Sequence, residues 1–303
     1  MPSSPSLAEG SSAGREGRVV SGHGRRLLVE SNEGVRILCH TRGKKSEAVV
    51  GDRVRWQASG DEGVIETILP RTNLLYRQDE WKTKAFAANI DQLLVVVAAE
   101  PVFSESQLAR ALIAAADAAI ATRIVLNKRD LPAFAAARER LQPYAAMGVD
   151  VLELALKRDG AEAHERLAPL LAGRATLVLG PSGAGKSTLV NLMVADAKAQ
   201  IGEISQALNT GRHTTTATQW YWLDAARTSA LIDSPGFQEF GLRHNAADRL
   251  AALMPDIGGH ASECRFYNCT HRHEPGCGVL AALGRGEIAE SRYRIYREIF
   301  EEL

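Results

Sequence analysis

Hydrophobic and polar positions change their spacing twice along this chain of 303 residues. Up to about residue 69 they alternate in short runs, separated by Gly, Ser and Asn turns, a pattern typical of β-strands. Five runs predict strands, at residues 18–20, 26–29, 35–39, 49–56 and 63–69. Five short strands so close together favour a small closed barrel, with an OB-fold as the expected architecture.

Residues 71 to about 90 resemble a linker, and after them strands alternate with helices. Strands are predicted at residues 92–98, 123–126, 150–156, 175–179, 217–223 and 229–232. Helices are predicted at residues 104–120, 133–147 and 161–171, and from residue 189 on. The alternation predicts a doubly wound α/β domain.

The expected fold class is therefore multi-domain. A Ser, Gly and Pro rich tail at residues 1–16 is expected to be disordered, and the barrel covers residues 17–70. The α/β domain covers residues 71–240. Residues 241–303 form a mostly helical domain, with helices expected at residues 246–253 and 288–303.

Composition narrows the functional classes only slightly. Hydrophobic residues make up 45% and charged residues 24% of the chain, as in an ordinary globular protein. The formal net charge is zero, so any nucleic-acid contact must come from local basic patches. Residues 15–84 hold 14 Lys/Arg against 10 Asp/Glu, which fits an oligonucleotide-binding barrel and a solvated charged face equally well. The start lacks a signal peptide and the longest apolar run is short, so we expect a cytoplasmic protein without membrane contact.

A phosphate-binding loop is the strongest motif. The string G-P-S-G-A-G-K-S-T has the form G-x4-G-K-S/T and stands between an apolar strand and a helix. It comprises Gly180, Pro181, Ser182, Gly183, Ala184, Gly185, Lys186, Ser187 and Thr188. Glycines let the backbone approach a phosphate chain, Lys186 would reach the β- and γ-phosphates, and the Ser187 hydroxyl would bind Mg²⁺. The alternative is a glycine-rich turn before a core helix.

A guanine-recognition motif, Asn127-Lys128-Arg129-Asp130, follows the strand predicted at residues 123–126. The Asp130 carboxylate can accept hydrogen bonds from the guanine N1–H and 2-amino groups. Asn127 can bond the N7/O6 edge, and the Lys128 stem can lie along the ring. Arg129 is the free position of the motif. Adenine would leave the carboxylate unpaired, so the site would reject it.

A magnesium and γ-phosphate motif, Asp233-Ser234-Pro235-Gly236, ends the strand predicted at residues 229–232. Asp233 would hold Mg²⁺ through water, and the Gly236 N–H would contact the γ-phosphate. One threonine of the preceding string G-R-H-T-T-T, most simply Thr215, would give the second hydroxyl ligand of Mg²⁺.

The order of these motifs is unusual. In regulatory GTPases the phosphate loop precedes the guanine motif, whereas here the guanine motif comes about fifty residues earlier, so the domain is circularly permuted. Permutation is physically allowed because the termini of a compact domain usually lie close together. The segment after Asp233 then leads directly into the C-terminal domain and can pass nucleotide state to it.

A metal site is predicted from three cysteines and a histidine near the C-terminus. Cys264, Cys269, His271 and Cys277 offer three thiolates and one imidazole, which suits a closed structural Zn²⁺ site. His273 and His260 are rival ligands, and free cysteines in a helical tail are the alternative. A second group, listed next, would either touch RNA or anchor a helix with a basic solvent-exposed face: Arg292, Tyr293, Arg294, Tyr296 and Arg297.

Together, the barrel, the permuted motifs and the zinc pattern resemble the ribosome small subunit-dependent GTPase A family, also called RsgA or YjeQ. The resemblance covers nearly the whole chain from about residue 17. It implies a GTPase that hydrolyses GTP to GDP with Mg²⁺, carries one structural Zn²⁺, and acts as a monomer. It also implies binding to the 30S ribosomal subunit and its 16S rRNA, late in subunit maturation, with hydrolysis stimulated by the subunit.

Two positions depart from common GTPase patterns. Leu154-Ala155 stands where a base-binding Ser-Ala is usual, and Phe237 stands where many GTPases carry a water-orienting glutamine. With Lys186 as one catalytic residue, His213 becomes the candidate for positioning the attacking water, although a contact with rRNA or solvent explains it equally well. An RNA-binding scaffold with negligible turnover, and an ATPase with an accidental N-K-R-D, are the rival functions.

Overall fold

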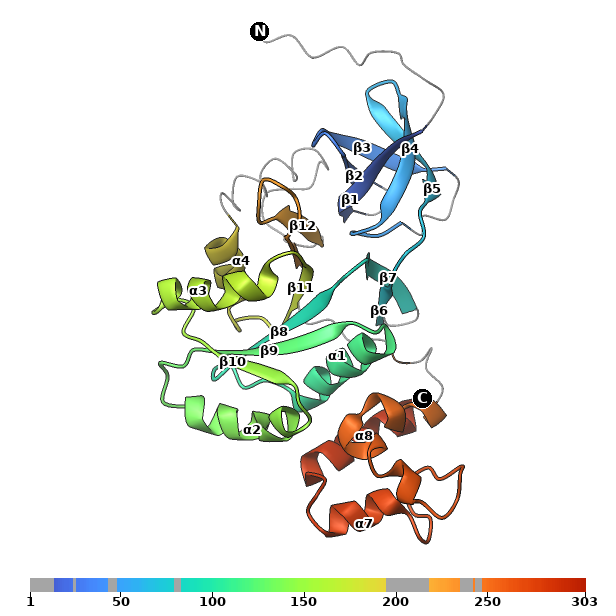
Figure 1. Ribbon diagram of the computed structural model, residues 1–303, viewed down its shortest axis with the longest axis vertical. Coiled ribbons are helices and arrows are strands. Elements are labelled where there is room, and N and C mark those ends of the chain that lie inside the picture. Colours follow the sequence, from blue (N-terminus) through green and yellow to red (C-terminus); the bar gives the residue numbers. More distant parts are fainter. Residues whose placement is uncertain are drawn as a thin grey trace.

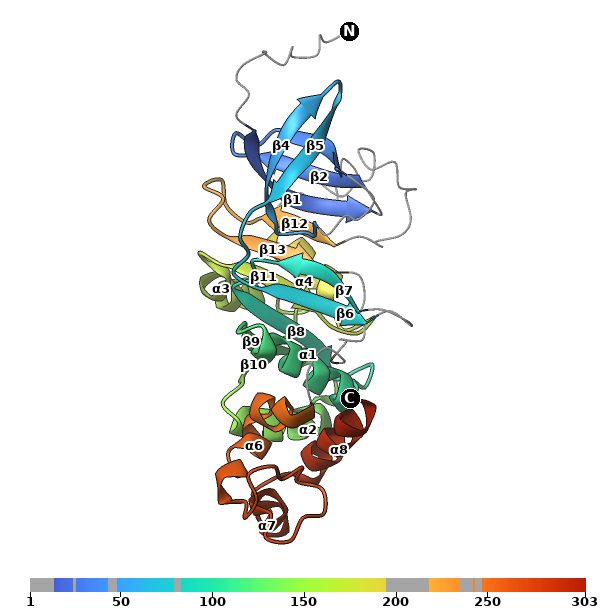
Figure 2. The same cartoon turned by 90° about the vertical axis from the view of Figure 1, so that its right-hand side faces the viewer.

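The computed structural model describes residues 14–23, 26–42, 48–78, 83–194, 218–234, 242 and 247–303. Three parts follow one another along the long axis of the molecule: a strand-rich part, a central sheet covered by helices, and a helical part (Figures 1 and 2). Three expected site residues, His213, Thr215 and Gly236, lie outside the described residues.

The N-terminal part is a five-stranded barrel, which confirms the expected OB-like fold. Its strands are β1 (Arg15–His23), β2 (Arg26–Ser31), β3 (Arg36–Thr41), β4 (Arg53–Ser59) and β5 (Glu62–Ile68). Pairing of β1 with β4 closes the barrel, and β3 runs parallel to β5. In β4 the side chains alternate between solvent and core, so that Val54 and Trp56 are buried. Closure leaves no free sheet edge between these strands.

The expected linker at residues 71–90 is wrong over most of its length. It contains an antiparallel hairpin, β6 (Leu74–Gln78) and β7 (Thr83–Ala88). The hairpin contacts the barrel, because Ala88 N–H donates to Val50 C=O at 2.9 Å. Its apolar alternation covers only a few residues on each side of a polar turn, which is too short for a reliable strand pattern.

The central part is a six-stranded sheet in the order β10 (Asp150–Glu153), β9 (Ala121–Asn127), β8 (Gln92–Ala98), β11 (Ala175–Leu179), β13 (Ala230–Asp233) and β12 (Gln219–Trp222). All neighbours are parallel except β12 and β13. The strand before the phosphate loop, β11, lies beside the first strand of the sheet in chain order, β8. Their carboxyl ends therefore meet at one edge of the sheet, where α/β proteins bind ligands.

Helices cover both faces of this sheet. Alternate residues of β8 divide between the two cores: Leu93, Val95 and Val97 belong to the core that includes α1 (Glu105–Asp117) and α2 (Phe134–Ala146). The intervening β8 residues belong to the opposite core, with α3 (Gly160–Leu171) and α4 (Lys186–Met193). This double burial explains why β8 is apolar almost throughout instead of alternating.

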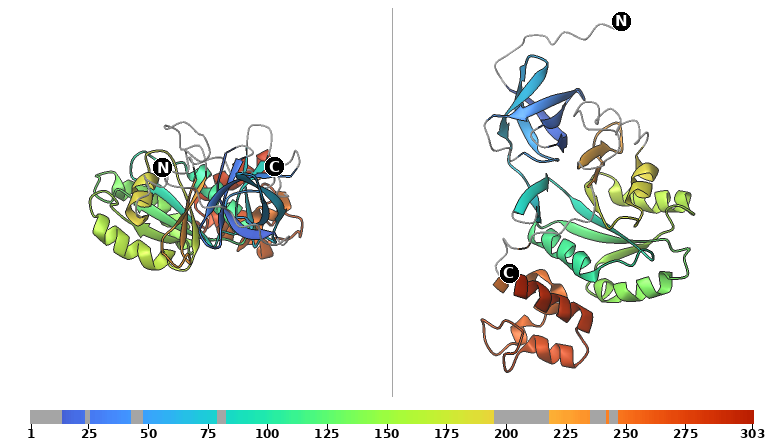
Figure 3. Two further views of the ribbon diagram at one scale, coloured as in Figure 1. Left: turned by 90° about the horizontal axis from the view of Figure 1, so that it is seen from above. Right: turned by 180° about the vertical axis from the view of Figure 1, so that it is seen from behind.

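A single register pair, Ser21 with Gln219, joins β1 of the barrel to β12 of the central sheet. The barrel and the central sheet therefore form one continuous set of hydrogen-bonded strands, which Figure 3 shows from behind.

The C-terminal part consists of short helices and turns. They are η1 (Ala247–Arg249), η2 (Ala251–Leu253), α6 (Pro255–Gly258), η3 (Ala261–Glu263), α7 (Gly278–Gly284) and α8 (Glu290–Glu302). The helix expected at residues 246–253 is replaced by two 3₁₀ turns. Pro255 explains its end, because a residue before proline avoids the helical region, and Met254 is extended at φ −120° and ψ 95°.

Helix α8 matches the expected C-terminal helix and is anchored by its buried face. Arg292 is only 2% exposed, and its guanidinium pairs with Asp256 at 2.7 Å. It also lies over the Tyr144 ring of α2, 4.8 Å from the ring centroid. Within the described ranges, each helix is too short or too polar to cross a lipid bilayer.

Candidate functional site

The phosphate loop joins β11 to α4, and its glycines are required by the backbone. Gly180, Gly183 and Gly185 have φ of 152°, 77° and 111°, values that side chains other than glycine rarely allow. A Cβ on Gly180 would lie 2.0 Å from the Val96 carbonyl oxygen, and one on Gly185 would lie 2.2 Å from Asn127 Nδ2. The loop is therefore fixed against β8 and β9, and it opens onto the N-terminus of an eight-residue helix.

The Lys186 ammonium lies over the loop and donates to the carbonyl oxygens of Gly180 at 2.5 Å and Pro181 at 3.1 Å. Burial lowers the pKa of Lys186, and the nearby Asp233 carboxylate acts in the opposite direction. A partly buried cation held only by carbonyl oxygens is well suited to neutralise an incoming anion. Lys186 thus fits a role in binding a phosphate chain.

Asn127 joins the guanine motif to the phosphate loop. Its amide Nδ2 donates to the Ala184 carbonyl oxygen at 2.8 Å, and its Oδ1 accepts from the Leu156 N–H at 3.0 Å. The side chain is 4% exposed, so both bonds are shielded from water. One residue therefore connects the loops that follow β9, β10 and β11. The sequence indicated a base contact for Asn127 and gave no sign of this positioning role.

The remaining residues of the guanine motif point in different directions. Lys128 has φ of 64°, and its ammonium donates to the Glu100 carbonyl oxygen. The Arg129 guanidinium pairs with Glu162 of α3 at 2.7 Å. Asp130 is exposed and has no hydrogen bond or ion pair within the described residues, which leaves its carboxylate available for a ligand.

The two described candidates for magnesium binding lie at neighbouring strand and loop ends. Ser187 begins α4 beside Lys186 and is exposed, whereas Asp233 ends β13. Burial raises the pKa of Asp233 to about 6, and the nearby Lys186 cation partly offsets this effect. A hydroxyl and a carboxylate are oxygen ligands of the kind Mg²⁺ prefers, so the two residues fit that ion.

Four side chains of the C-terminal part form a cluster that could hold a metal ion. The ligand atoms of Cys264, Cys269, His271 and Cys277 all lie within 4.8 Å of one another. His271 Nδ1 is 3.4 Å from Cys264 Sγ and 3.6 Å from Cys277 Sγ, and the two sulfurs are 3.9 Å apart. Tetrahedral zinc, with bonds of about 2.3 Å to sulfur and about 2.0 Å to nitrogen, separates its ligand atoms by about 3.5–3.8 Å. The donor set and spacing therefore fit Zn²⁺.

Charge and hydrogen bonding around this cluster also favour a cation. Burial raises the pKa of the Cys269 and Cys277 thiols, so their thiolates require a compensating positive charge. Backbone N–H groups of Gly278 and Leu280 donate to Cys264 Sγ at 3.3 Å and Cys277 Sγ at 3.4 Å. Neither rival histidine, His260 or His273, belongs to the cluster.

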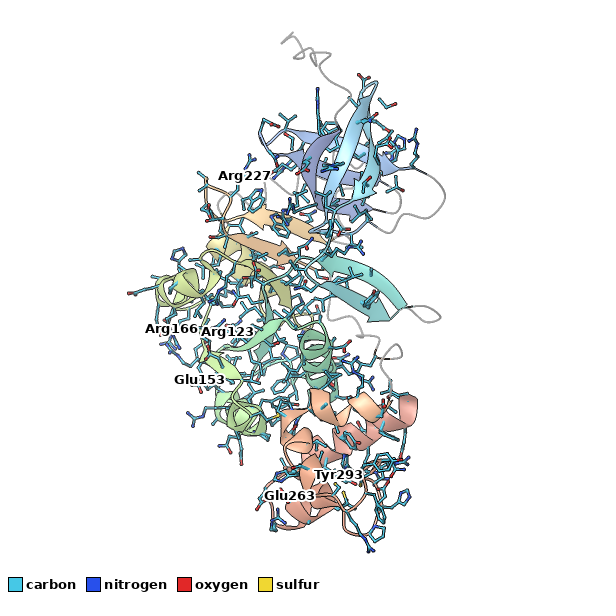
Figure 4. All side chains as sticks on the ribbon, turned by 45° about the vertical axis from the view of Figure 1, so that its right-hand side comes forward. Arg123, Glu153, Arg166, Arg227, Glu263 and Tyr293 are labelled. Atoms are coloured by element: carbon cyan, nitrogen blue, oxygen red, sulfur yellow. The ribbon has the colours of Figure 1, made fainter. Side chains whose placement is uncertain are left out.

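Glu274 and two tyrosines of α8 position the metal-site loop, and the sequence analysis missed the role of Glu274. The Glu274 carboxylate accepts from the backbone N–H of Thr270 at 2.8 Å and of Arg272 at 3.0 Å, on either side of His271. The Tyr293 hydroxyl donates to the His271 carbonyl oxygen at 2.9 Å (Figure 4). The only available signal was an acidic residue inside a Cys/His loop.

The barrel meets the central sheet at a charged junction. Trp222 Nε1 of β12 donates to Glu30 Oε1 of β2 at 2.6 Å, and Glu30 is only 5% exposed. Arg227, in the turn between β12 and β13, donates to the Asn32 carbonyl oxygen at 3.2 Å (Figure 4). Arg18 of β1 lies over the Trp220 ring, 4.4 Å from its centroid. The hairpin that ends at Asp233 is therefore bonded to the barrel.

Comparison with known proteins identifies the family. The family model described as RsgA GTPase matches residues 68–243. The chain belongs to the RsgA GTPase family. It is therefore a GTPase, and the expected resemblance is confirmed.

Relatives of this family match over the whole chain. The Small ribosomal subunit biogenesis GTPase RsgA of Variovorax paradoxus is 61% identical, covering 99% of this chain and 96% of the relative. The protein of the same name from Burkholderia pseudomallei is 53% identical and covers 100% of this chain and 96% of the relative.

Two solved structures of the family share the fold. YjeQ from Thermotoga maritima is 32% identical with a TM-score of 0.71, covering 95% of this chain and 98% of that one. YloQ, whose title calls it a circularly permuted GTPase, is 26% identical with a TM-score of 0.69, covering 98% and 97% of the two chains. The permuted order of the motifs is thus shared with solved RsgA relatives.

Proposed function

We propose that this protein hydrolyses GTP to GDP and phosphate during late maturation of the small ribosomal subunit, and that the subunit stimulates hydrolysis. The observation that carries the nucleotide part is the pair of buried bonds from Asn127 to Ala184 and Leu156. They join the guanine motif to the phosphate loop. The ribosomal part is supported by whole-chain identity to relatives named for small ribosomal subunit biogenesis.

In this proposal the guanine base binds beside residues 127–130, with Asp130 accepting from its N1–H and 2-amino groups. Residues 180–188 hold the phosphates, and Lys186 neutralises charge that develops on them. Ser187 and Asp233 hold Mg²⁺, which stabilises charge on the β- and γ-phosphates. Thr215 as a further Mg²⁺ ligand, Gly236 at the γ-phosphate and His213 at the attacking water remain proposals from the sequence.

Zinc is proposed as the metal of Cys264, Cys269, His271 and Cys277, in a structural role. All four ligand positions are filled by protein atoms, so no position is left for substrate. The metal would replace the hydrophobic core that so small a segment cannot form. We propose three domains on this basis, at residues 17–70, 71–240 and 241–303, preceded by a disordered tail at residues 1–16.

We further propose that the protein is a cytoplasmic monomer that contacts 16S rRNA in the 30S subunit. The OB-like barrel supports this, because that architecture commonly binds oligonucleotides. An ATPase with an accidental guanine motif is the less favoured alternative, since Asn127 bonds directly to the phosphate loop. The scaffold alternative rests on Phe237, an apolar residue where many GTPases orient water with glutamine.

Nucleotide-dependent cosedimentation tests the ribosomal part of this proposal. Purified small and large subunits are mixed separately with the protein and either GDP or a non-hydrolysable GTP analogue. We expect binding to small subunits only, and stronger binding with the analogue than with GDP. Lys186→Ala serves as the control, because it should remove the difference between the nucleotides. Equal binding to both subunits, or no binding, would contradict the proposal.

A further inference from the structure

Two adjacent aromatic side chains near the metal cluster project into solvent. Of the five large hydrophobic side chains exposed in the described residues, two are aromatic, Phe266 and Tyr267. Phe266 is 42% exposed and Tyr267 is 103% exposed, so the Tyr267 ring touches nothing else in the described chain. Aromatic rings carry a large hydrophobic surface, and full exposure of one on an ordered loop indicates a binding surface.

The loop that carries these rings, residues 265–268, is held in place at both ends. It is flanked by Cys264 and Cys269 of the metal cluster. Arg265 N–H donates to the Gly276 carbonyl oxygen at 2.9 Å, and Cys269 N–H donates to the Phe266 carbonyl oxygen at 3.3 Å. Gly276 permits this contact, because it has φ of 74° and a Cβ there would lie 3.1 Å from Arg265 Cβ. A loop fixed in this way loses little entropy on binding.

The charge around the rings favours an anionic partner. The Arg265 guanidinium lies 5.4 Å from the Phe266 ring centroid and forms no ion pair with the described residues. The nearest acidic residue within the loop segment, Glu274, accepts from the backbone N–H groups of Thr270, Arg272 and His273, so its charge is turned inward. An unpaired arginine beside exposed aromatic rings is the combination that stacks and binds single-stranded nucleic acid.

We propose that residues 265–268 form a nucleotide-binding surface, which we call the aromatic knuckle. An unpaired RNA base stacks on Tyr267, a backbone phosphate pairs with Arg265, and the exposed Asn268 amide contacts a base edge. The inference rests on the proposed function, because the RNA in question would be that of the small subunit. A protein partner is disfavoured, since residues 265–268 offer isolated rings and a free cation without any described apolar groove between them.

Three substitutions of Tyr267 separate stacking from general hydrophobic contact. The dissociation constant for purified small subunits is measured with a non-hydrolysable GTP analogue, using the full-length protein at one zinc per chain. Tyr267→Ala should weaken binding roughly 5- to 150-fold, the range observed when a base loses an aromatic partner. Tyr267→Phe keeps the ring and should bind within about twofold of the wild type, whereas Tyr267→Leu keeps apolar volume but should resemble Tyr267→Ala.

Ultraviolet cross-linking followed by nuclease and protease digestion gives an independent readout. We expect a peptide containing residues 265–268 with a covalently attached nucleotide. Unchanged affinity of Tyr267→Ala, wild-type affinity of Tyr267→Leu, or a cross-link to a ribosomal protein instead of RNA would each overturn the inference while leaving the proposed function intact. A wild-type protein that fails to bind small subunits would overturn both.

Discussion

Asn127 illustrates what a motif residue does beyond its motif. Sequence spacing identified it as part of a guanine-binding tetrapeptide, which implied contact with the base. The structure adds two buried hydrogen bonds that fix the loops after β10 and β11. No spacing rule predicts those bonds, because their partners, Ala184 and Leu156, contribute only backbone atoms.

Asp130 provides the most direct test of base selection. Asp130→Asn removes the charged acceptor and should weaken GTP binding by about 2–4 kcal/mol, or roughly 30- to 1,000-fold, because bonds to charged groups are the strong ones. The variant should gain affinity for xanthosine triphosphate, whose carbonyl replaces the guanine 2-amino group and can accept from Asn. Calorimetric titration with both nucleotides measures this. Unchanged GTP affinity would contradict the assignment of Asp130.

Asp233 should make stability depend on pH in the absence of nucleotide and Mg²⁺. Burial raises its pKa to about 6, above its value in an unfolded chain, so the folded state takes up a proton first as pH falls. The ionised carboxylate is therefore destabilising at neutral pH, and this penalty disappears as pH falls through 6 towards 4.

Asp233→Asn removes the penalty at every pH. At pH 7.5 its free energy of unfolding should exceed that of the wild type by about 1–3 kcal/mol. The difference should shrink below pH 6 and vanish near pH 4 in urea titrations. A difference that stays constant with pH, or a less stable variant at pH 7.5, would show that Asp233 is not buried as described.

At the scale of elements, the metal-site loop links a sequence pattern to a fold. Cys277 is both a member of the cluster and the N-cap of α7, since its sulfur accepts from the Leu280 N–H. Metal binding and the start of α7 are therefore coupled. The cysteine and histidine spacing predicted the cluster, but Glu274 and the α8 tyrosines that hold the loop could be recognised only in the folded chain.

Histidine substitutions test which imidazole binds the metal. His271→Ala should lower zinc affinity by more than the 10- to 100-fold typical of changes outside the ligand set. His273→Ala and His260→Ala are matched controls that should retain one zinc per chain. Zinc content by elemental analysis and competition with a chelator give the answer. Loss of zinc in His273→Ala, with zinc retained in His271→Ala, would reverse the assignment.

The elements that the sequence predicted well are those with long, consistent patterns. The buried strand β8 and helices α1, α2, α3 and α8 lie within a few residues of their expected positions. Hairpin β6–β7 was missed because its apolar runs are short, and the helix expected at residues 246–253 was wrong because Pro255 ends the segment. Short segments depend on their neighbours more than on their own pattern.

For the molecule as a whole, the sequence predicted the permuted order but not how the barrel is attached. Bonds from Trp222 to Glu30 and from Arg227 to Asn32 join the barrel to hairpin β12–β13, which ends at Asp233. The contacts involve residues nearly two hundred positions apart, which no local pattern connects. They provide a physical route between the nucleotide site and the barrel.

A double-mutant cycle tests this attachment. Trp222→Phe keeps a ring but removes the N–H donor to a buried carboxylate, so unfolding free energy should fall by about 1.5–3 kcal/mol. In a Glu30→Gln background the same substitution should cost clearly less. Urea unfolding followed by circular dichroism measures all four proteins. Equal costs in both backgrounds would mean that the bond does not stabilise the junction.

The central claim is that this chain is a GTPase whose turnover depends on the small ribosomal subunit. The most direct measurement is GTP turnover with and without purified 30S subunits, alongside Lys186→Ala. We predict slow intrinsic turnover, marked stimulation by small subunits, and no stimulation in the variant. Turnover that small subunits leave unchanged, in a protein that still binds GTP, would contradict the claim and favour an RNA-binding scaffold that holds GTP as a structural ligand.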